Sequence, residues 1–130
     1  YLENGIPFAY KNLGYLNYDQ LATAYQAADI FVCPSIEDSG PMMINQSIMS
    51  GTPVVSFKMG VSLDLVINNK TGFEVEIKNT LAFARAIKNI LSLPKKEIEK
   101  MKSNCRALGL EKTSMYSIKK QWINLLENEL

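Results

Sequence analysis

The chain has 130 residues, of which 47% are hydrophobic and 21% charged, as expected of one globular domain with a core of its own. Its 14 basic and 13 acidic residues give a net charge of +1, which provides no long-range field that would favour nucleic acid or an anionic membrane. The sequence holds no histidine, which excludes a histidine base or a histidine metal site within this chain. No apolar run reaches the roughly 20 residues that a membrane span needs.

The first segments of the chain predict two strands with a helix between them. Residues 8–15 are rich in β-forming side chains and predict a strand. Asn17 follows as the expected N-cap of a helix over about 18–28. Residues 30–33 form a continuous apolar run, which is typical of a parallel strand covered on both faces. The side of the helix that should face the sheet consists of Leu21, Ala24, Tyr25 and Ala28.

A short acidic turn, a helix and a second buried strand come next. The helix is expected over 41–50, because Ser39 or Gly40 can cap it and Pro41 suits its first turn. Residues 54–57 predict the strand. The unit therefore places a helix N-terminus directly after a strand, at the carboxyl edge of the predicted sheet.

That helix N-terminus is a candidate binding site. The N–H groups of its first turn, at Met42 and Met43, have no acceptor within the helix. Together with the helix dipole they favour an anion, and in open α/β sheets this crevice is where ligands bind. An acidic surface turn that only caps a helix is the ordinary alternative.

The next part of the chain predicts one more strand between two helices. Ser62 is expected to cap a short helix, and the alternation in residues 73–77 predicts a half-exposed edge strand. A cap at Asn79 or Thr80 should then start a helix that reaches about Leu93. The predicted apolar side of this helix consists of Leu81, Ala84, Ile87, Lys88 and Leu91.

Two further helices close the chain. One is expected over about 95–108 and ends at Gly109, which suits a left-handed cap. The other is expected over about 114–129. Four strands alternating with helices predict an α/β fold, a Rossmann-like doubly wound parallel sheet flanked by helices. The apolar stripe of the last helix consists of Ile118, Trp122, Leu125 and Leu126.

Cys33 and Cys105 are the only cysteines in the sequence. Cys33 lies in an apolar strand pattern and Cys105 in a helical one, so we expect two buried free thiols rather than a disulfide or a metal pair. Free thiols fit a reducing cytoplasm best.

Three motifs between residues 37 and 73 carry a family resemblance. They are Glu37-Asp-Ser-Gly-Pro-Met-Met-Ile-Asn-Gln46, Gly51-Thr-Pro-Val-Val55 and Asn69-Lys-Thr-Gly-Phe73. In this order and spacing they resemble the donor-binding half of retaining glycosyltransferases of family 4, the group 1 type. Those enzymes carry an acidic residue, seven intervening residues and a second glutamate, followed by a Gly-Thr/Val-Pro-Val strand and a Thr-Gly-Phe turn. The match covers about residues 13–75.

The resemblance implies that residues 1–130 form a single nucleotide-sugar-binding domain, the partial C-terminal domain of a GT-B fold, with C-terminal helices over about 95–130. It also implies that the N-terminal acceptor domain is missing, together with earlier strand-helix units and their Arg/Lys clamp for the diphosphate. We expect Trp122 and the last helix to pack on the domain. In the family, however, this helix crosses to the other domain, so an exposed apolar stripe here would support the fragment interpretation.

The resemblance also assigns roles to the site residues. Asp38 takes the place of the acidic residue that contacts the donor sugar, and the adjacent Glu37 could serve if the turn is one residue longer. Gln46, about 7 Å along the helix, takes the place of the glutamate that bonds the ribose hydroxyls. An amide loses charge assistance there, which should weaken binding by roughly 1 kcal/mol. The diphosphate is expected against the helix N-terminus, formed by Ser39, Gly40, Pro41, Met42 and Met43.

The predicted function is transfer of a hexose, with retention, from a nucleotide-diphosphate sugar to a glycan of polysaccharide or lipopolysaccharide type. The donor is a substrate, so no cofactor is expected. The sequence has no Asp-x-Asp pair and no histidine cluster, so no metal is expected either. The expected location is the cytoplasm, and the fragment alone should not catalyse, because the acceptor site needs the missing half.

Several alternatives stay open at this point. A non-catalytic glycosyltransferase-like scaffold, degenerate at Gln46, is the main one. A retaining glycosidase needs two carboxylates about 5 Å apart, whereas the side chains of sequence neighbours such as Glu37 and Asp38 usually diverge. An epimerase of the same architecture would need acid/base side chains, and there is no histidine to supply one. The glycine-rich fingerprints of dinucleotide-binding and P-loop domains are absent from the sequence.

Basic residues gather on the helix expected over 95–108. Their side chains form either an ordinary solvated surface or a face that docks on the inner side of an anionic membrane, where lipid-linked acceptors lie. The residues concerned are Lys95, Lys96, Lys100 and Lys102.

Overall fold

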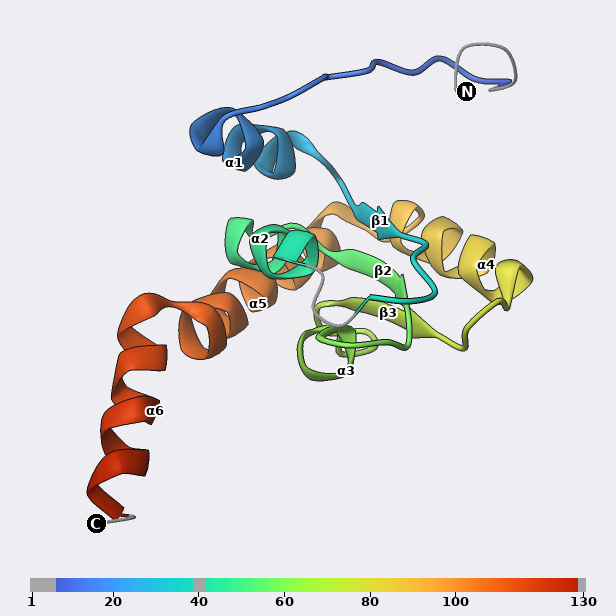
Figure 1. Cartoon of the computed structure of the whole chain (residues 1–130). Helices are drawn as coiled ribbons and strands as arrows, with labels where there is room; N and C mark the ends of the chain where they lie inside the picture. Colours follow the sequence, from blue (N-terminus) through green and yellow to red (C-terminus); the bar gives the residue numbers. More distant parts are fainter. Residues whose placement is uncertain (1–6, 39–41, 129–130) are drawn as a thin grey trace.

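The computed structural model describes residues 7–38 and 42–128, which form one parallel sheet flanked by helices (Figure 1). The sheet has three strands in the order β1-β2-β3. Phe31 of β1 and Gly72 of β3 both lie opposite Val54 of β2, and both pairs run parallel. This arrangement confirms the predicted α/β fold. The strands are β1 (Phe31–Cys33), β2 (Val54–Phe57) and β3 (Gly72–Val75).

The described part of the chain has six helices, of which α2, α3, α4 and α5 cover the sheet. α2, α3 and the later part of α5 cover one face, where Ile44, Ile48 and Cys105 are fully buried. α4 and the earlier part of α5 cover the other face, where Ile90 is fully buried. The helices are α1 (Tyr18–Ala27), α2 (Met42–Ser50), α3 (Ser62–Leu65), α4 (Thr80–Leu91), α5 (Lys95–Thr113) and α6 (Met115–Asn128).

Only the central strand is covered on both faces. All four residues of β2 are buried, as its apolar sequence predicts. β1 lies at the edge of the sheet, and Val32 is 36% exposed. The expectation that residues 30–33 are covered on both faces is therefore wrong, because a hydrophobic run does not by itself reveal which strand lies at the edge.

The strand predicted over residues 8–15 does not form. Residues 7–17 contain no helix or strand, and Phe8 and Tyr15 are both largely exposed. Gly14 has a φ of 63°, which interrupts an extended backbone. A strand needs a hydrogen-bonded neighbour, and β1 pairs only with β2 among the described residues. High β propensity alone does not provide that partner.

Of the four predicted helix N-caps, three lie within the described residues, and two of these are confirmed. Asn17 forms a full capping box with Gln20 at the start of α1, and the side chain of Asn79 caps α4. The cap assigned to Ser62 is wrong, because Ser62 lies within α3. Its buried hydroxyl instead accepts from the Met59 N–H at 2.9 Å and lies 2.9 Å from the Phe57 carbonyl oxygen, which it can donate to. Ser62 thus fixes the loop that follows β2.

The buried face of α4 differs from the predicted one. Leu81 and Leu91 are 61% and 57% exposed, whereas Phe83, Ala86 and Ile90 are buried against the sheet. Both sets have the spacing of a helical stripe, so periodicity alone favours neither. The aromatic contact between Phe83 and Phe57, with ring centroids 4.7 Å apart, belongs to the set that packs on β2.

α5 continues through Gly109 to Thr113, so the predicted end of this helix is wrong. Gly109 is buried within the helix and faces α2. A Cβ atom there would lie 2.8 Å from the Cα atom of Met49. This glycine therefore permits a close approach of two helix backbones, which sequence alone does not distinguish from a terminal glycine.

Cations of α5 also hold the ends of two other helices. Arg106 donates to the carbonyl oxygen of Met49 near the end of α2, and Lys102 donates to the carbonyl oxygen of Ala28 at the C-cap of α1 at 3.2 Å. Such contacts complement the negative C-terminal ends of the helices. Lys102 is thus half-buried and engaged, whereas Lys95 and Lys96 are exposed.

Cys33 and Cys105 are both free and buried, as predicted. The Cys105 thiol donates to the carbonyl oxygen of Thr71 at 3.3 Å. Burial raises the pKa of this thiol from 9.0 to about 12. The folded chain therefore keeps a proton between these two pH values that the unfolded chain loses.

We expect the free energy of unfolding to fall as pH rises from about 9 to about 12, by up to about 1.4 kcal/mol per pH unit from Cys105 alone. The variant Cys105→Ala should lack this contribution. Urea unfolding of both proteins at pH 8 and pH 10.5 measures it, since lysine and tyrosine titrations are common to the two. Parallel pH profiles for the two proteins would contradict the assignment.

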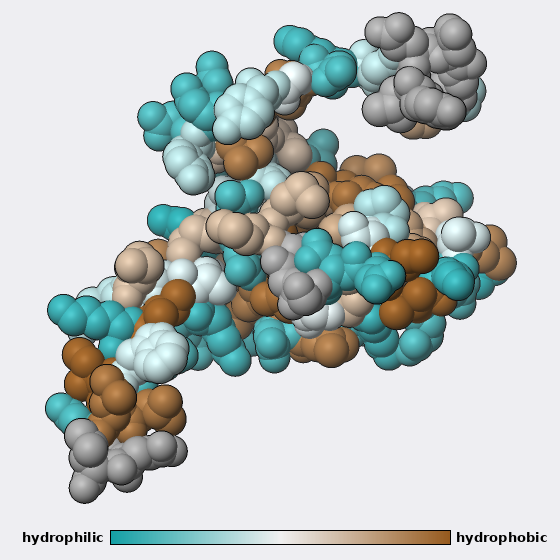
Figure 2. Space-filling view, viewed as in Figure 1, coloured by the Kyte–Doolittle hydropathy of each residue, from teal (hydrophilic) through white to brown (hydrophobic). Residues whose placement is uncertain are grey.

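α6 extends away from the sheet, and the expectation that it packs on the domain is wrong (Figure 1). Trp122 is 61% exposed. Figure 2 shows hydrophobic side chains on the surface of this protruding helix. The exposed apolar stripe consists of Ile118, Trp122, Ile123, Leu125 and Leu126. Among the described helices, none is both long enough and apolar enough to cross a bilayer.

Candidate functional site

The predicted site lies at the carboxyl end of the parallel sheet. Glu37 and Asp38 are exposed in the loop that follows β1, and α2 begins shortly afterwards at Met42. The site residues predicted between them, Ser39, Gly40 and Pro41, lie outside the described residues, and so does the predicted cap of α2. The order of strand, acidic loop and helix is thus as predicted.

α2 is positioned by its buried face. Ile44, Ser47 and Ile48 are fully buried, and the Ser47 hydroxyl donates to the carbonyl oxygen of Thr52 at 3.0 Å. Met42 and Met43 are exposed and lie in the first turn of α2, where backbone N–H groups have no acceptor within the helix. Ile44 and Ile48 recur at helical spacing and form the buried side of α2, whereas Met42 and Met43 are apolar but exposed.

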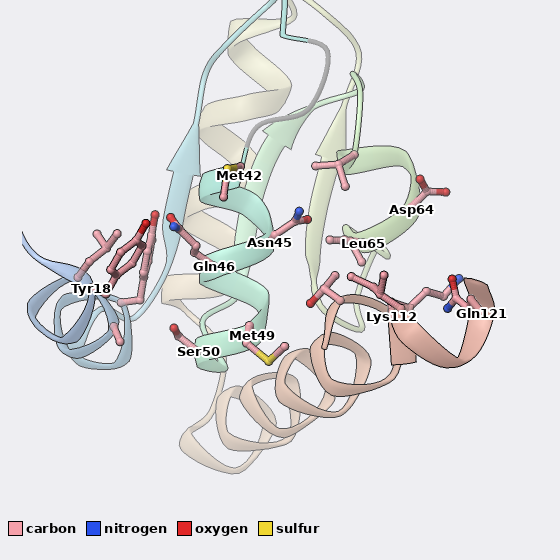
Figure 3. A pocket seen from close by; sticks show the side chains of 16 residues that line it. Tyr18, Met42, Asn45, Gln46, Met49, Ser50, Asp64, Leu65, Lys112 and Gln121 are labelled. Atoms are coloured by element: carbon pink, nitrogen blue, oxygen red, sulfur yellow. The ribbon is translucent and has the colours of Figure 1, made fainter. Parts of the chain in front are cut away.

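A groove with a volume of ≈ 750 Å³ runs along the outer side of α2 (Figure 3). α1 borders the groove on one side, and α3 borders it on the other with the junction of α5 and α6. This volume falls in the range of small-molecule sites, which is roughly 300–1,000 Å³. Residues of α2 that line the groove are Met42, Asn45, Gln46, Met49 and Ser50.

Among the predicted site residues that the structure describes, two line this groove. Gln46 is half-buried and extends toward α1 and Tyr18, and Met42 lies at the N-terminal end of α2 (Figure 3). Glu37, Asp38 and Met43 are described but are not part of its lining. The groove therefore contains the residue assigned to the ribose, and the residues assigned to the sugar lie outside it.

Sequence analysis missed the polar residue next to Gln46. Asn45 extends from the other side of α2 toward α3 and Leu65 (Figure 3). Its Oδ1 atom is buried and has no hydrogen-bond partner among the described residues. An amide within an apolar helical face is the signal that could have indicated it.

Charged groups near the site are few. Asp64 and Lys112 line the groove from α3 and from α5. Lys58, directly after β2, forms an ion pair with Glu76, and this hydrogen bond raises the pKa of Lys58. Among the described residues, no three Cys, Asp or Glu side chains come together as a metal site.

Comparison with known protein families matches all three sequence motifs within a single family. The family model of group 1 glycosyl transferases matches residues 3–108, which include β1, the acidic loop, α2 and β3. The chain belongs to the group 1 glycosyltransferase family. The predicted family resemblance is thereby confirmed.

Curated relatives of this group 1 glycosyltransferase chain match it over little more than half its length. D-inositol 3-phosphate glycosyltransferase of Corynebacterium diphtheriae is 32% identical over 73 residues, which are 56% of this chain and 17% of that protein. Sulfoquinovosyl transferase SQD2 of Arabidopsis thaliana is 33% identical over 75 residues, which are 55% of this chain and 14% of that protein. The matched segment thus spans a fifth or less of these relatives.

Solved structures confirm the GT-B type of fold for this glycosyltransferase chain. Sucrose-phosphate synthase from Thermosynechococcus elongatus aligns with a TM-score of 0.78 and 27% identity, over 89% of this chain and 29% of that one. TarM of S. aureus, in a complex with fondaparinux, alpha-GlcNAc-glycerol and UDP, aligns with a TM-score of 0.69 and 26% identity. That alignment covers 81% of this chain and 21% of TarM.

Proposed function

We propose that this chain binds the nucleotide-diphosphate sugar for a glycosyltransferase reaction that transfers a hexose. The observation that carries the proposal is the N-terminus of α2 at the carboxyl edge of a parallel sheet, with Gln46 in the groove beside it. Family membership supports a nucleotide sugar as the donor. The TarM complex with UDP supports the same class of ligand.

The diphosphate lies against the N–H groups of Met42 and Met43 in this proposal. Sugar transfer needs the diphosphate to leave while the anomeric carbon gains positive character. Preorganised helix N–H groups stabilise the charge that develops on the leaving group, and they need no reorganisation to do so. In this proposal, Ser39, Gly40 and Pro41 complete the diphosphate site directly before Met42.

The remaining roles follow the family pattern. Gln46 bonds the ribose hydroxyls, while Asp38, or Glu37 in its place, contacts the donor sugar. Transfer proceeds with retention onto a glycan acceptor of polysaccharide or lipopolysaccharide type, without a metal or a cofactor. Because Asp38 and Glu37 lie outside the lining of the groove, the sugar extends from the groove toward the β1–α2 loop.

The acceptor requires a second domain in this proposal, and the chain alone is inactive. The exposed stripe of α6 is the surface that such a domain covers. A cytoplasmic enzyme with a lipid-linked acceptor works at the inner face of the membrane. Lys95, Lys96 and Lys100 are exposed cations for that contact, although Lys95 also lies 3.8 Å from a carboxylate oxygen of Glu99, and Lys102 is engaged with Ala28.

A second candidate function is a non-catalytic scaffold of the same family. Gln46 favours it, because the family carries a glutamate at this position. A scaffold needs the fold but not the ribose contact. The two candidate functions therefore differ in whether a carboxylate at position 46 would change the affinity for the nucleotide sugar.

We expect Gln46→Glu to tighten donor binding by about 1 kcal/mol, which is roughly fivefold in Kd. A carboxylate accepts hydrogen bonds from both ribose hydroxyls, whereas an amide offers only one acceptor. Calorimetric titration of the chain with UDP, GDP and their sugar conjugates measures the change. The control is Gln26→Glu, which adds the same charge at an exposed position of α1 outside the groove. Binding to neither wild type nor Gln46→Glu would favour the scaffold.

A further inference from the structure

Tyr18 is the aromatic residue that borders the groove opposite Gln46. It is the first residue of α1 and is 85% exposed, and its side chain is part of the groove lining. Figure 3 shows Gln46 extending from α2 toward Tyr18. The groove therefore has an accessible aromatic ring on the side of α1, facing the amide that is assigned to the ribose.

Several contacts hold α1, and with it Tyr18, in place beside α2. The Thr52 hydroxyl, between α2 and β2, donates to the carbonyl oxygen of Tyr25 at 2.6 Å. The ring of Tyr25 also packs edge-on against Phe31 of β1, with ring centroids 5.4 Å apart. A capping box fixes the first turn of α1, where Tyr18 lies. These contacts preorganise this side of the groove, as is usual for small-molecule sites.

The α1 side of the groove differs in chemistry from the opposite side. Leu21 and Ala22 line it beside Tyr18, so this side is apolar and aromatic. The charged residues of the lining, Asp64 and Lys112, belong to α3 and α5 on the other side. A flat, uncharged ring system is the part of a ligand that matches an exposed aromatic side chain, because two π-faces stack without a charged partner.

We infer that the ring of Tyr18 stacks on the base of the bound nucleotide sugar. This inference rests on the proposed function, in which Gln46 bonds the ribose hydroxyls. Met42 and Gln46 are four residues apart and hence lie on one face of α2, so a diphosphate near Met42 places the ribose near Gln46. The base is attached to that ribose, and Tyr18 is the aromatic side chain toward which Gln46 extends.

The test compares Tyr18→Ala with Tyr18→Phe in the full 130-residue chain, with UDP and GDP as calorimetric probes. We expect Tyr18→Ala to weaken the Kd of the nucleotide that wild type binds by about tenfold, because the base loses its stacking partner. Tyr18→Phe keeps the ring and should stay within about twofold of wild type. Tyr116→Ala, at an exposed position of α6 outside the groove lining, is the control for losing an exposed tyrosine.

NMR spectra of the nucleotide provide a second measurement, which a purely structural role of Tyr18 would not affect. The ring current of a stacked side chain shifts the base protons upfield. We expect this shift with wild type and with Tyr18→Phe, and its loss with Tyr18→Ala. We also expect equal thermal unfolding midpoints for all of these proteins, because Tyr18 is largely exposed.

The other outcomes overturn the inference. An unchanged Kd for Tyr18→Ala, or a loss for Tyr18→Phe as large as for Tyr18→Ala, excludes stacking and leaves the proposed function intact. A lower unfolding midpoint for Tyr18→Ala excludes it as well, since Tyr18 would then serve the fold. If wild type binds neither UDP nor GDP, the proposed function itself fails, and the role of Tyr18 with it.

Discussion

Replacing Gly72 with alanine is expected to lower the free energy of unfolding by roughly 4 kcal/mol or more, a large fraction of the stability of a domain this size. Gly72 begins β3 with a φ of 155° and pairs with Val54 of the central strand. An added Cβ would lie 1.8 Å from the carbonyl oxygen of Val54 and 2.7 Å from its carbonyl carbon. Both atoms belong to the backbone of a strand buried on both faces, so neither can move aside.

Urea unfolding of Gly72→Ala measures this loss, and Gly14→Ala is the matched control. Gly14 also has a positive φ, of 63°, but a Cβ there meets no atom within 4 Å. Its substitution should therefore cost only about 1 kcal/mol of backbone strain. Equal losses for the two variants would show that strain, rather than the contact with Val54, determines the cost.

Replacing Gly109 with alanine is expected to cost about 2–3 kcal/mol, although alanine favours the helix by about 1 kcal/mol over glycine. The added Cβ would lie 2.8 Å from the Met49 Cα and 3.2 Å from the Ile48 carbonyl carbon. α2 and α5 must then separate. Since α2 also carries Gln46, this movement displaces a residue of the proposed binding site. The substitution should therefore weaken nucleotide binding as well as the fold.

Chemical denaturation and donor titration of Gly109→Ala measure both effects. Ser103→Ala, at an exposed position of the same helix, is the control and should leave stability nearly unchanged or slightly higher. A stabilised Gly109→Ala variant would contradict the close approach of the two helices. In that case the gain in helix propensity would exceed any packing cost.

The segment from β1 to β2 was predictable because several local signals agree there. An apolar strand, a turn, a helix and a second apolar strand each have a distinct pattern, and the structure follows their type and order, although β1 is an edge strand. The segment 8–15 shows the opposite case. Its β propensity is high, yet a strand depends on a partner that the local sequence does not encode.

Residues whose sequence pattern fits two different structures account for the other differences between the predicted and the observed fold. Gly109 fits a helix end and a helix-helix contact equally well, and only the position of Met49 decides between them. The apolar residues of α4 form two overlapping stripes, and the contact of Phe83 with Phe57 selects one. Likewise, the amphipathic pattern of α6 predicts an apolar face but not what covers it.

The residues of the candidate site that follow from the spacing of a sequence motif were predictable, whereas those that depend on how the helices pack around the groove were not. The family resemblance indicated Gln46 through its separation from Asp38, and the structure places Gln46 in the groove. Asn45 and the contribution of α1 through Tyr18 were missed, because they depend on how α1 and α3 flank α2. The structure does not place Asp38 or Glu37 in the lining of that groove, so their proposed contact with the sugar depends on the ligand extending beyond it.

An amide NMR titration of the 130-residue chain with UDP, GDP and their common sugar conjugates tests the central claim most directly. The account predicts that one nucleotide shifts a cluster of resonances between Ser39 and Gln46, at the N-terminus of α2, and that Asn89 on α4 stays unchanged. Such a result would establish the donor site and identify the base. No shift with any member of the panel, or shifts confined to other helices, would contradict donor binding at α2.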